Sequence, residues 1–214
     1  MKSEAYGQVA RVGRALGNGS RLELLELIAQ ADQSVEVLAR MSGIALTTVS
    51  SHLQVLKAAG LVRTRRQGTT IFYRLADDTV AGLLVTLKSV AADALPDLRV
   101  IAADVELSGS GTPVPMVHVL SGSDDPYILD VRPSHEFSAG HYPGAASIPL
   151  EDLPARASEV PTGRRVVVYC RSEFCALARD AARLLRGRGV DAYAMDEGVL
   201  EWRARGNVQL RATA

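Results

Sequence analysis

The sequence has few cysteines and no long apolar run. Its only two cysteines are Cys170 and Cys175, which fall within one short segment. No stretch approaches the ~18 apolar residues of a membrane-spanning helix, and the first residues, Met1-Lys2-Ser3-Glu4, do not begin a signal peptide. These absences predict a cytoplasmic protein with no membrane partner. In the reducing cytosol, a close cysteine pair is more often reactive, redox-active or metal-binding than a structural cross-link.

The sequence also has no net charge at pH 7, because 24 lysines and arginines balance 24 aspartates and glutamates. This balance argues against a polycation that binds nucleic acid through total charge alone. Residues 37–76 depart from it, since they contain no acidic residue. Their basic residues are Arg40, Lys57, Arg63, Arg65, Arg66 and Arg74. Such a local excess is the electrostatic pattern expected of a phosphate-binding surface.

The N-terminal half has the pattern of several helices followed by a hairpin and a long helix. Apolar spacing predicts helices at 4–17, 21–30, 35–41 and 45–59, with Ser20 and Ser34 as N-caps of the second and third. Strands are expected at 61–65 and 70–75, so that residues 66–69 form a basic hairpin tip. Asp77 is expected to cap a long helix that reaches about residue 95. Domain 1–105 is therefore predicted to be mainly α-helical.

The C-terminal half has a different pattern, in which short strands alternate with helices. Residues 106–112 include Ser108-Gly109-Ser110-Gly111 and predict a flexible linker. Beyond it, strands are expected at 127–131, 145–148, 165–169 and 192–195, with helices at about 150–158 and 176–188. This alternation predicts an α/β domain over residues 113–210 with a mostly parallel sheet.

The predicted helix 45–59 has one apolar and one polar face. Its apolar residues Leu46, Val49, Leu53 and Leu56 recur at helical spacing and are expected to face the core. The polar residues suit base edges or phosphates in a DNA major groove. They are Thr47, Thr48, Ser50, Ser51, His52, Gln54 and Lys57. The hairpin residues Arg63, Arg65, Arg66 and Gln67 are expected to reach neighbouring phosphates or a minor groove, and the alternative is a solvated polar face.

This half resembles the ArsR/SmtB family of winged helix-turn-helix repressors. The resemblance rests on Arg21-Leu22-Glu23-Leu24-Leu25, on Val37-Leu38-Ala39 and on the run from Thr48 to Val62, which includes Ser51-His52-Leu53 and Gly60-Leu61-Val62. It implies a homodimer that reads a palindromic double-stranded DNA operator. Residues 34–39 lack the metal-binding cysteines of many family members. His52 with Asp77 and Asp78 could be metal ligands, but a DNA-facing His and a helix cap are favoured.

The second half resembles the rhodanese family. The matching segments are Ile128–Phe137, Gly140–Ala145, the strand that leads to Cys170, and Gly198-Val199-Leu200-Glu201-Trp202. The resemblance implies that Cys170 carries a persulfide held by backbone amides of the following loop. The implied amides are those of Arg171, Ser172, Glu173, Phe174, Cys175 and Ala176. A cysteine between a strand and a helix N-terminus has a lowered thiol pKa, which the cation of Arg171 would lower further.

Three further residues of this half have two interpretations each. Asp130 and Arg132 either form an ion pair that fixes their loop, which is favoured, or contact substrate. His141 is expected to support the fold rather than act as a base, and Trp202 to anchor the core.

The cysteine loop departs from the pattern of active sulfurtransferases. Glu173 stands where these enzymes often have glycine, and Cys175 stands where they often have arginine. Both changes argue against fast turnover of thiosulfate. Cys175 is either a second thiol that resolves a persulfide or sulfenate on Cys170 into a disulfide or polysulfide bridge, or a small packing residue.

Three functions are compatible with these features. The leading hypothesis is a transcriptional regulator, expected to be a repressor, that senses sulfane sulfur or an oxidant through Cys170. The alternatives are a sulfurtransferase that forms a Cys170 persulfide, with weak activity at most, and a thiol-based arsenite or soft-metal sensor. No motif predicts an organic cofactor or a resident metal.

Overall fold

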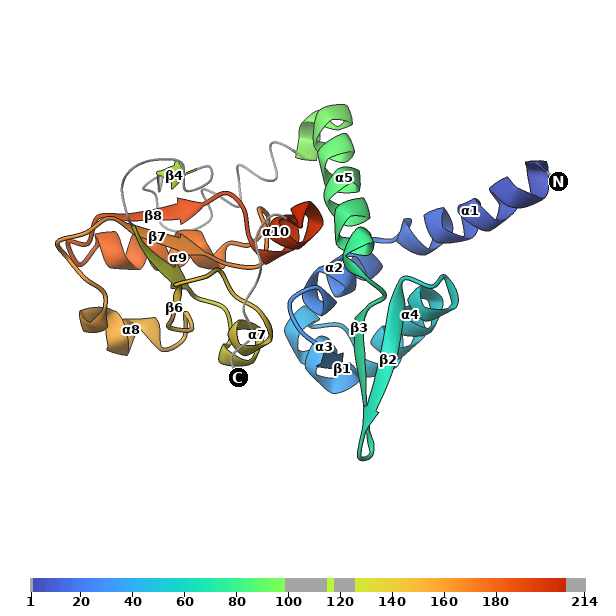
Figure 1. The fold of residues 1–214 in the computed structure, drawn as a ribbon, viewed down its shortest axis with the longest axis horizontal. Helices are drawn as coiled ribbons and strands as arrows, with labels where there is room; N and C mark the ends of the chain where they lie inside the picture. The colour runs from blue at the N-terminus through green and yellow to red at the C-terminus, as the bar shows by residue number, and fades with distance from the viewer. Residues whose placement is uncertain (1, 99–114, 118–125, 207–214) are drawn as a thin grey trace. The chain divides into compact units, whose positions relative to one another are not determined.

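The structure is a computed structural model that describes residues 2–98, 115–117 and 126–206 (Figure 1). The chain divides into two compact units, residues 1–84 and 85–214. The predicted linker 106–112 lies outside the described residues, so the predicted domain bounds stay predictions. Among the described residues, no helix combines the length and apolarity that crossing a membrane requires.

The first unit combines four helices with a small antiparallel sheet. Strand β3 lies between β1 and β2, and Arg65 pairs with Phe72 in the β2–β3 register. The unit ends within α5, which continues into the second unit. The elements are α1 (Lys2–Leu16), α2 (Gly19–Ile28), β1 (Gln33–Ser34), α3 (Val35–Ser42), α4 (Leu46–Ala58), β2 (Val62–Gln67), β3 (Thr70–Leu75) and α5 (Asp78–Ala94). This is the predicted helix, turn, helix and wing order.

Local signals fix where these helices begin and end. The Ser34 hydroxyl accepts a hydrogen bond from the Val37 amide, and Asp77 accepts one from the Thr79 amide, so both predicted caps are confirmed. The predicted Ser20 cap is wrong, because the Asn18 side chain caps α2 instead. Asparagine is at least as good a cap as serine. The helix begins two residues earlier than predicted, and it also ends two residues earlier, at Ile28. Gly43, at φ +69°, makes the left-handed turn between α3 and α4.

The second unit contains a parallel five-stranded sheet in the order β4-β8-β7-β5-β6. The predicted α/β class is confirmed. Helices α8 and α9 supply residues to one face of the sheet, and α10 supplies residues to the other. The elements are β4 (Met116–Val117), β5 (Tyr127–Asp130), α7 (Ser134–Ala139), β6 (Ala146–Ser147), α8 (Leu153–Arg156), the 3-10 helix η1 (Ala157–Glu159), β7 (Val166–Tyr169), α9 (Leu177–Arg186), β8 (Ala192–Met195) and α10 (Val199–Arg205).

Strand β7 is the centre of this unit and leads directly to Cys170. All four of its residues are buried. Val166 and Val168 face the core on the α9 side, whereas Val167 and Tyr169 face the α10 side with Trp202. This alternation follows the two-residue period of a strand. Because the sheet is parallel, the carboxyl ends of β5, β7 and β8 meet at one edge, where loops of α/β proteins commonly form sites.

Candidate DNA-binding surface and cysteine loop

Helix α4 buries most of its predicted apolar face. Val49, Leu53 and Leu56 are fully buried. The prediction for Leu46 is wrong, because this residue is 49% exposed. Leu46 is the first residue of α4, and helical spacing alone does not show where the core under a helix ends. The predicted inward face is therefore confirmed only from Val49 onward.

The structure places the polar residues of α4 where DNA could reach them. Ser50 and His52 are half-buried, and the Gln54 side chain donates to the Tyr73 hydroxyl at 3.2 Å. The exposed members of the set are Thr47, Thr48, Ser51, Gln54 and Lys57. The exposed side of α4 is therefore mostly polar, with Leu46 and Val55 as its exposed apolar residues.

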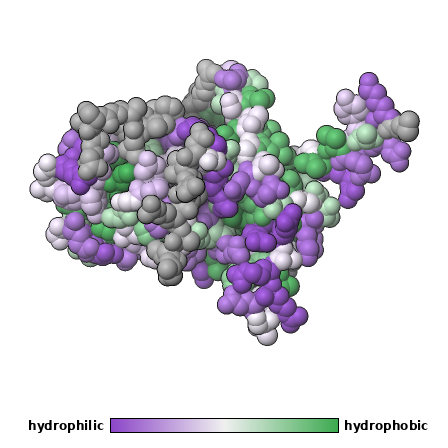
Figure 2. All heavy atoms as spheres, viewed as in Figure 1, coloured by the Kyte–Doolittle hydropathy of each residue, from purple (hydrophilic) through white to green (hydrophobic). Residues whose placement is uncertain are grey.

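The basic residues of the hairpin lie on strand β2 rather than at its tip. The strand runs to Gln67, two residues beyond the prediction, and leaves only Gly68 and Thr69 to make the turn. Gly68 has φ +61°, which lets so short a turn close. Hydrophilic residues cover the projecting end of this hairpin (Figure 2).

Arg65 and Arg66 have different surroundings. The Arg65 Nε lies 3.2 Å from an Asp32 carboxylate oxygen, and its guanidinium lies 5.2 Å from the centre of the Phe72 ring. Arg66 is exposed, and its Nε donates to the Gly68 carbonyl at 3.0 Å. Successive strand residues point to opposite faces. Arg63, Arg65 and Gln67 therefore share one face of the wing, and Arg66 lies on the other.

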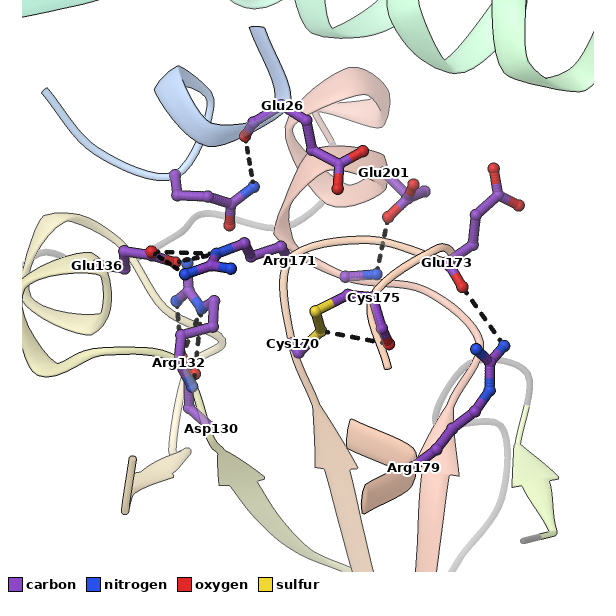
Figure 3. The surroundings of a disulfide bond; sticks show 12 residues. Glu26, Asp130, Arg132, Glu136, Cys170, Arg171, Glu173, Cys175, Arg179 and Glu201 are labelled. Carbon is purple, nitrogen blue, oxygen red and sulfur yellow. Dashed lines mark hydrogen bonds and ion pairs between the residues drawn. A yellow bond between two sulfur atoms is a disulfide. The ribbon is translucent and has the colours of Figure 1, made fainter. Parts of the chain in front are cut away.

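Cys170 and Cys175 form a disulfide across the loop between β7 and α9 (Figure 3). Their Cα atoms are 6.4 Å apart. The Cys175 amide donates to the Ser172 carbonyl at 3.1 Å, which closes a tight turn. Cys170 is only 2% exposed, whereas Cys175 is half-buried. Cys175 is therefore the more accessible sulfur of the bridge, and its amide is engaged within the turn rather than in the predicted cradle.

Helix α10 holds the cysteine loop from the other side. The amides of Val199 and Leu200 donate to the carbonyls of Cys170 and Arg171, at 3.4 and 3.0 Å. Gly198 precedes them and packs directly on this backbone, because a Cβ there would collide with backbone atoms of Cys170, Arg171 and Ser172. In the sequence, Gly198 is distinguished only as part of a family motif. Its role depends on an approach between two segments that only the fold reveals.

The cation of Arg171 is paired with a carboxylate. Glu136 is fully buried, and its two oxygens accept hydrogen bonds from Arg171 at 2.7 to 3.1 Å. The Arg171 cation, which is expected to lower the pKa of the Cys170 thiol further, thus forms an ion pair with Glu136. Glu136 lies on α7, a short helix that the sequence analysis missed.

Asp130 and Arg132 form the predicted ion pair at the end of β5. Both side chains are 0% exposed, and one guanidinium nitrogen lies 2.6 Å from the carboxylate. Arg132 also donates to the Gly140 carbonyl at 2.8 Å. Burial alone would lower the pKa of Arg132, but the hydrogen bonds and charge of Asp130 raise it. The pair fixes two loops and keeps both charges in a region closed to solvent.

Other predicted residues support the fold around the loop. His141 stacks on Phe137 with ring centres 3.8 Å apart, and its Nδ1 lies 2.9 Å from the Phe137 carbonyl oxygen. Trp202 contacts the rings of Tyr142 and Tyr169. Burial raises the pKa of Tyr169, so its hydroxyl stays protonated.

Charged residues that the sequence analysis left unassigned surround Glu173 and Phe174. The Arg179 guanidinium lies 3.4 Å from the Glu173 carbonyl oxygen. The Lys88 ammonium lies 3.3 Å from the Glu173 carboxylate. Ala176 completes the loop as the N-cap of α9, and Ser172 is buried beneath it.

Asp77, which was considered as a metal ligand, forms hydrogen bonds at the start of α5 instead. The Asp77 carboxylate accepts from the hydroxyl and the amide of Thr79, and these hydrogen bonds lower the pKa of Asp77. Within the described part of the chain, no group of three or more His, Cys, Asp or Glu side chains is placed to hold a metal ion.

Both halves of the chain match known families. Residues 18–64 match the family of bacterial regulatory proteins of the arsR type, and residues 117–205 match the rhodanese-like domain. Together with the winged helix and the parallel sheet, these matches define a transcriptional regulator with an added rhodanese-like domain.

Individual relatives agree with this assignment. The chain is 42% identical over 207 residues to the HTH-type transcriptional regulator Rv0324 of Mycobacterium tuberculosis, covering 96% of this chain and 91% of that protein. It thus belongs to the ArsR family of HTH-type transcriptional regulators. The second half is 32% identical to a sulfurtransferase of Allochromatium vinosum, covering 41% of this chain and 80% of that one. The homodimeric winged helix-turn-helix DNA-binding domain of Mycobacterium bovis Mb0332 is 48% identical, covering 44% of this chain and 87% of that one, with a TM-score of 0.42.

Proposed function

We propose that the protein is a cytosolic, homodimeric repressor whose operator affinity depends on the sulfur chemistry of Cys170 and Cys175. The observation that carries this proposal is the placement of both sulfurs within bonding distance in one loop of the rhodanese-like unit. The sequence has no other cysteine, so thiol chemistry in this protein is confined to that loop.

The proposed chemistry has two steps. The Cys170 thiolate attacks the outer sulfur of a persulfide or polysulfide, whose S–S bond breaks and releases a thiolate. The Cys175 thiolate then attacks the Cys170 sulfur and expels hydrosulfide, which leaves the disulfide. Two protein thiols are oxidised, and one sulfane sulfur is reduced to sulfide. A peroxide would reach the same disulfide through a sulfenate, with water as the leaving group.

The unequal burial of the two cysteines supports a prediction of which sulfur an incoming thiol attacks when the disulfide is reduced. Because Cys170 is covered and Cys175 is half-buried, an incoming thiol meets the Cys175 sulfur first. Attack there releases Cys170 as the leaving thiolate, next to the start of α9. The regenerated nucleophile is then the one that the first step requires.

A homodimer is supported by apolar side chains left exposed on two helices. Tyr6 and Val9 on α1, and Leu83 and Val90 on α5, are at least 40% exposed. The M. bovis relative is homodimeric, and we extend this assembly to the present chain. Two copies of α4 would then read a palindromic operator.

The proposed function is tested on the full-length protein by fluorescence anisotropy. The probe is a DNA fragment selected in vitro for binding to the reduced protein. Polysulfide is expected to weaken binding ~100-fold, which corresponds to only ~2.7 kcal/mol of coupling. Equal affinities before and after complete formation of the disulfide, as verified by mass spectrometry, would refute the proposal.

Replacing Arg66 with Ala is expected to weaken binding to all DNA sequences alike and to reduce the slope of log K against log salt by about 1. Arg66 is exposed and its Nε donates to the backbone carbonyl of Gly68, so its charge is available to a phosphate. Titrations at several salt concentrations measure the slope. The exposed Arg188 on the rhodanese-like unit gives the matched control, because Arg188→Ala removes the same charge away from the winged helix. Equal slopes for both variants would show that Arg66 does not contact a DNA phosphate.

A sulfurtransferase is the second candidate, and the similarity to the A. vinosum enzyme favours it. We expect transfer from thiosulfate to cyanide to be at least ~100-fold slower than the 1–10³ s⁻¹ typical of enzymes. The physical reason is that the bridge consumes Cys170 and that Glu173 places a carboxylate in the loop. A turnover assay under reducing conditions measures this rate. Turnover in the typical range, together with a failure of the in vitro selection to yield a bound DNA fragment, would favour the sulfurtransferase function.

A further inference from the structure

A lysine from α5 is enclosed by the cysteine loop and α10. The Lys88 side chain is only 9% exposed, although lysine is normally solvated. Its ammonium lies 3.3 Å from Glu173 and 3.4 Å from Glu201, and it lies 4.3 Å from the centre of the Phe174 ring. Lys88 and these partners all belong to the second compact unit, residues 85–214. Two of the three partners lie between the two cysteines.

Glu201 gives Lys88 a second connection to the same loop. One carboxylate oxygen of Glu201 faces Lys88, and the other accepts a hydrogen bond from the Gly198 amide at 2.8 Å. Gly198 is the N-cap of α10, whose first amides donate to the carbonyls of Cys170 and Arg171. Lys88 therefore contacts the loop directly through Glu173 and Phe174, and indirectly through the N-terminus of α10.

The helix that carries Lys88 also belongs to the DNA-binding unit. Helix α5 runs without a break from Asp78 to Ala94, and its first seven residues lie in the unit that contains α4 and the wing. A helix transmits displacement along its axis because consecutive turns are hydrogen-bonded. A force applied at Lys88 thus acts on an element shared by both units.

From these contacts we propose that Lys88 couples the oxidation state of the cysteine pair to α5. The disulfide confines residues 171–174 to a tight turn that places Glu173 and Phe174 around the ammonium. Reduction releases this constraint, and the dithiol loop holds Lys88 less tightly. The inference rests on the proposed function for its DNA readout. It also predicts a local effect that does not involve DNA.

That local effect follows from reciprocity. If the disulfide strengthens the contacts of Lys88, then Lys88 must stabilise the disulfide by the same factor. Replacing Lys88 with Met should shift the equilibrium with glutathione toward the dithiol by ~3- to 10-fold, which lies in the lower part of the range for coupling between contacting residues. In this exchange, two glutathione thiols reduce the bridge and leave as one glutathione disulfide.

The experiment compares the full-length wild type with Lys88→Met, Lys88→Arg and Glu173→Gln. Operator anisotropy is measured for the reduced and the oxidised forms, and the disulfide fraction is measured in glutathione buffers. Lys88→Met should bind operator normally when reduced, and its response to oxidation should fall by the same ~3- to 10-fold. Lys88→Arg, which keeps the charge, should retain that response. Glu173→Gln changes a 44% exposed side chain and provides the test if Lys88→Met does not fold.

The outcomes separate this inference from the proposed function. A wild type that responds, with Lys88→Met or Glu173→Gln matching it in both measurements, overturns the role of Lys88 and leaves the proposed function standing. A wild type that does not respond overturns the proposed function and the link to DNA. In that case, a shifted glutathione equilibrium would support only the local contact, and an unshifted one would overturn that contact too.

Discussion

Replacing Cys170 with Ser is expected to leave operator binding by the reduced protein unchanged and to abolish its release by polysulfide. Serine is close to cysteine in size, so the buried position after β7 should still fold. Its hydroxyl cannot accept a sulfur atom or form a disulfide under these conditions. The expected loss is the whole ~100-fold response, or ~2.7 kcal/mol of coupling. Anisotropy titrations with and without polysulfide measure it directly.

Cys175→Ser is the matched variant for this test. It retains the nucleophile Cys170 but lacks the thiol that expels hydrosulfide. A persulfide should therefore accumulate on Cys170, visible by mass spectrometry as the mass of one added sulfur atom. If bridge formation drives release, this variant should bind operator like the reduced protein. Release of Cys170→Ser at the wild-type polysulfide concentration would show that the inducer acts elsewhere.

The sequence was sufficient to predict the fold of both halves because local patterns and the fold agree. The β-branched apolar run 166–169 predicted a buried strand, and Cys170 follows it in the sequence. Only four residues lie between the two cysteines in the sequence, so one loop had to contain both. The polar face of α4 followed from helical periodicity once Val49, Leu53 and Leu56 were assigned to the core.

The partners of these residues could not be predicted in the same way. Glu136 precedes Arg171 by 35 residues, and Lys88 precedes Glu201 by 113. No local spacing relates such pairs, because the path of the chain through the sheet decides which loops meet. Leu46 shows the opposite error, in which a correct period was extended past the edge of the core.

Removing the charge of Asp130 is expected to destabilise the rhodanese-like unit more than any other substitution considered for it. Asp130→Asn would remove the carboxylate that directly pairs with the buried guanidinium of Arg132, and breaking a buried pair in this way costs ~3–5 kcal/mol. The loss is a large part of the ~5–15 kcal/mol that stabilises a typical domain. Urea unfolding followed by tryptophan fluorescence isolates this unit, because Trp202 is the only tryptophan in the sequence and lies in its core.

Two controls decide whether burial is the cause. The Asp180–Arg183 pair has its carboxylate 46% exposed, so Asp180→Asn should cost no more than ~1 kcal/mol. The double variant Asp130→Asn with Arg132→Met removes both charges and should recover part of the stability lost by the single variant, because no unpaired buried charge remains. Equal unfolding midpoints for Asp130→Asn and Asp180→Asn would show that the buried pair contributes no more than a surface one. The loops at the end of β5 would then depend on packing and backbone hydrogen bonds rather than on this ion pair.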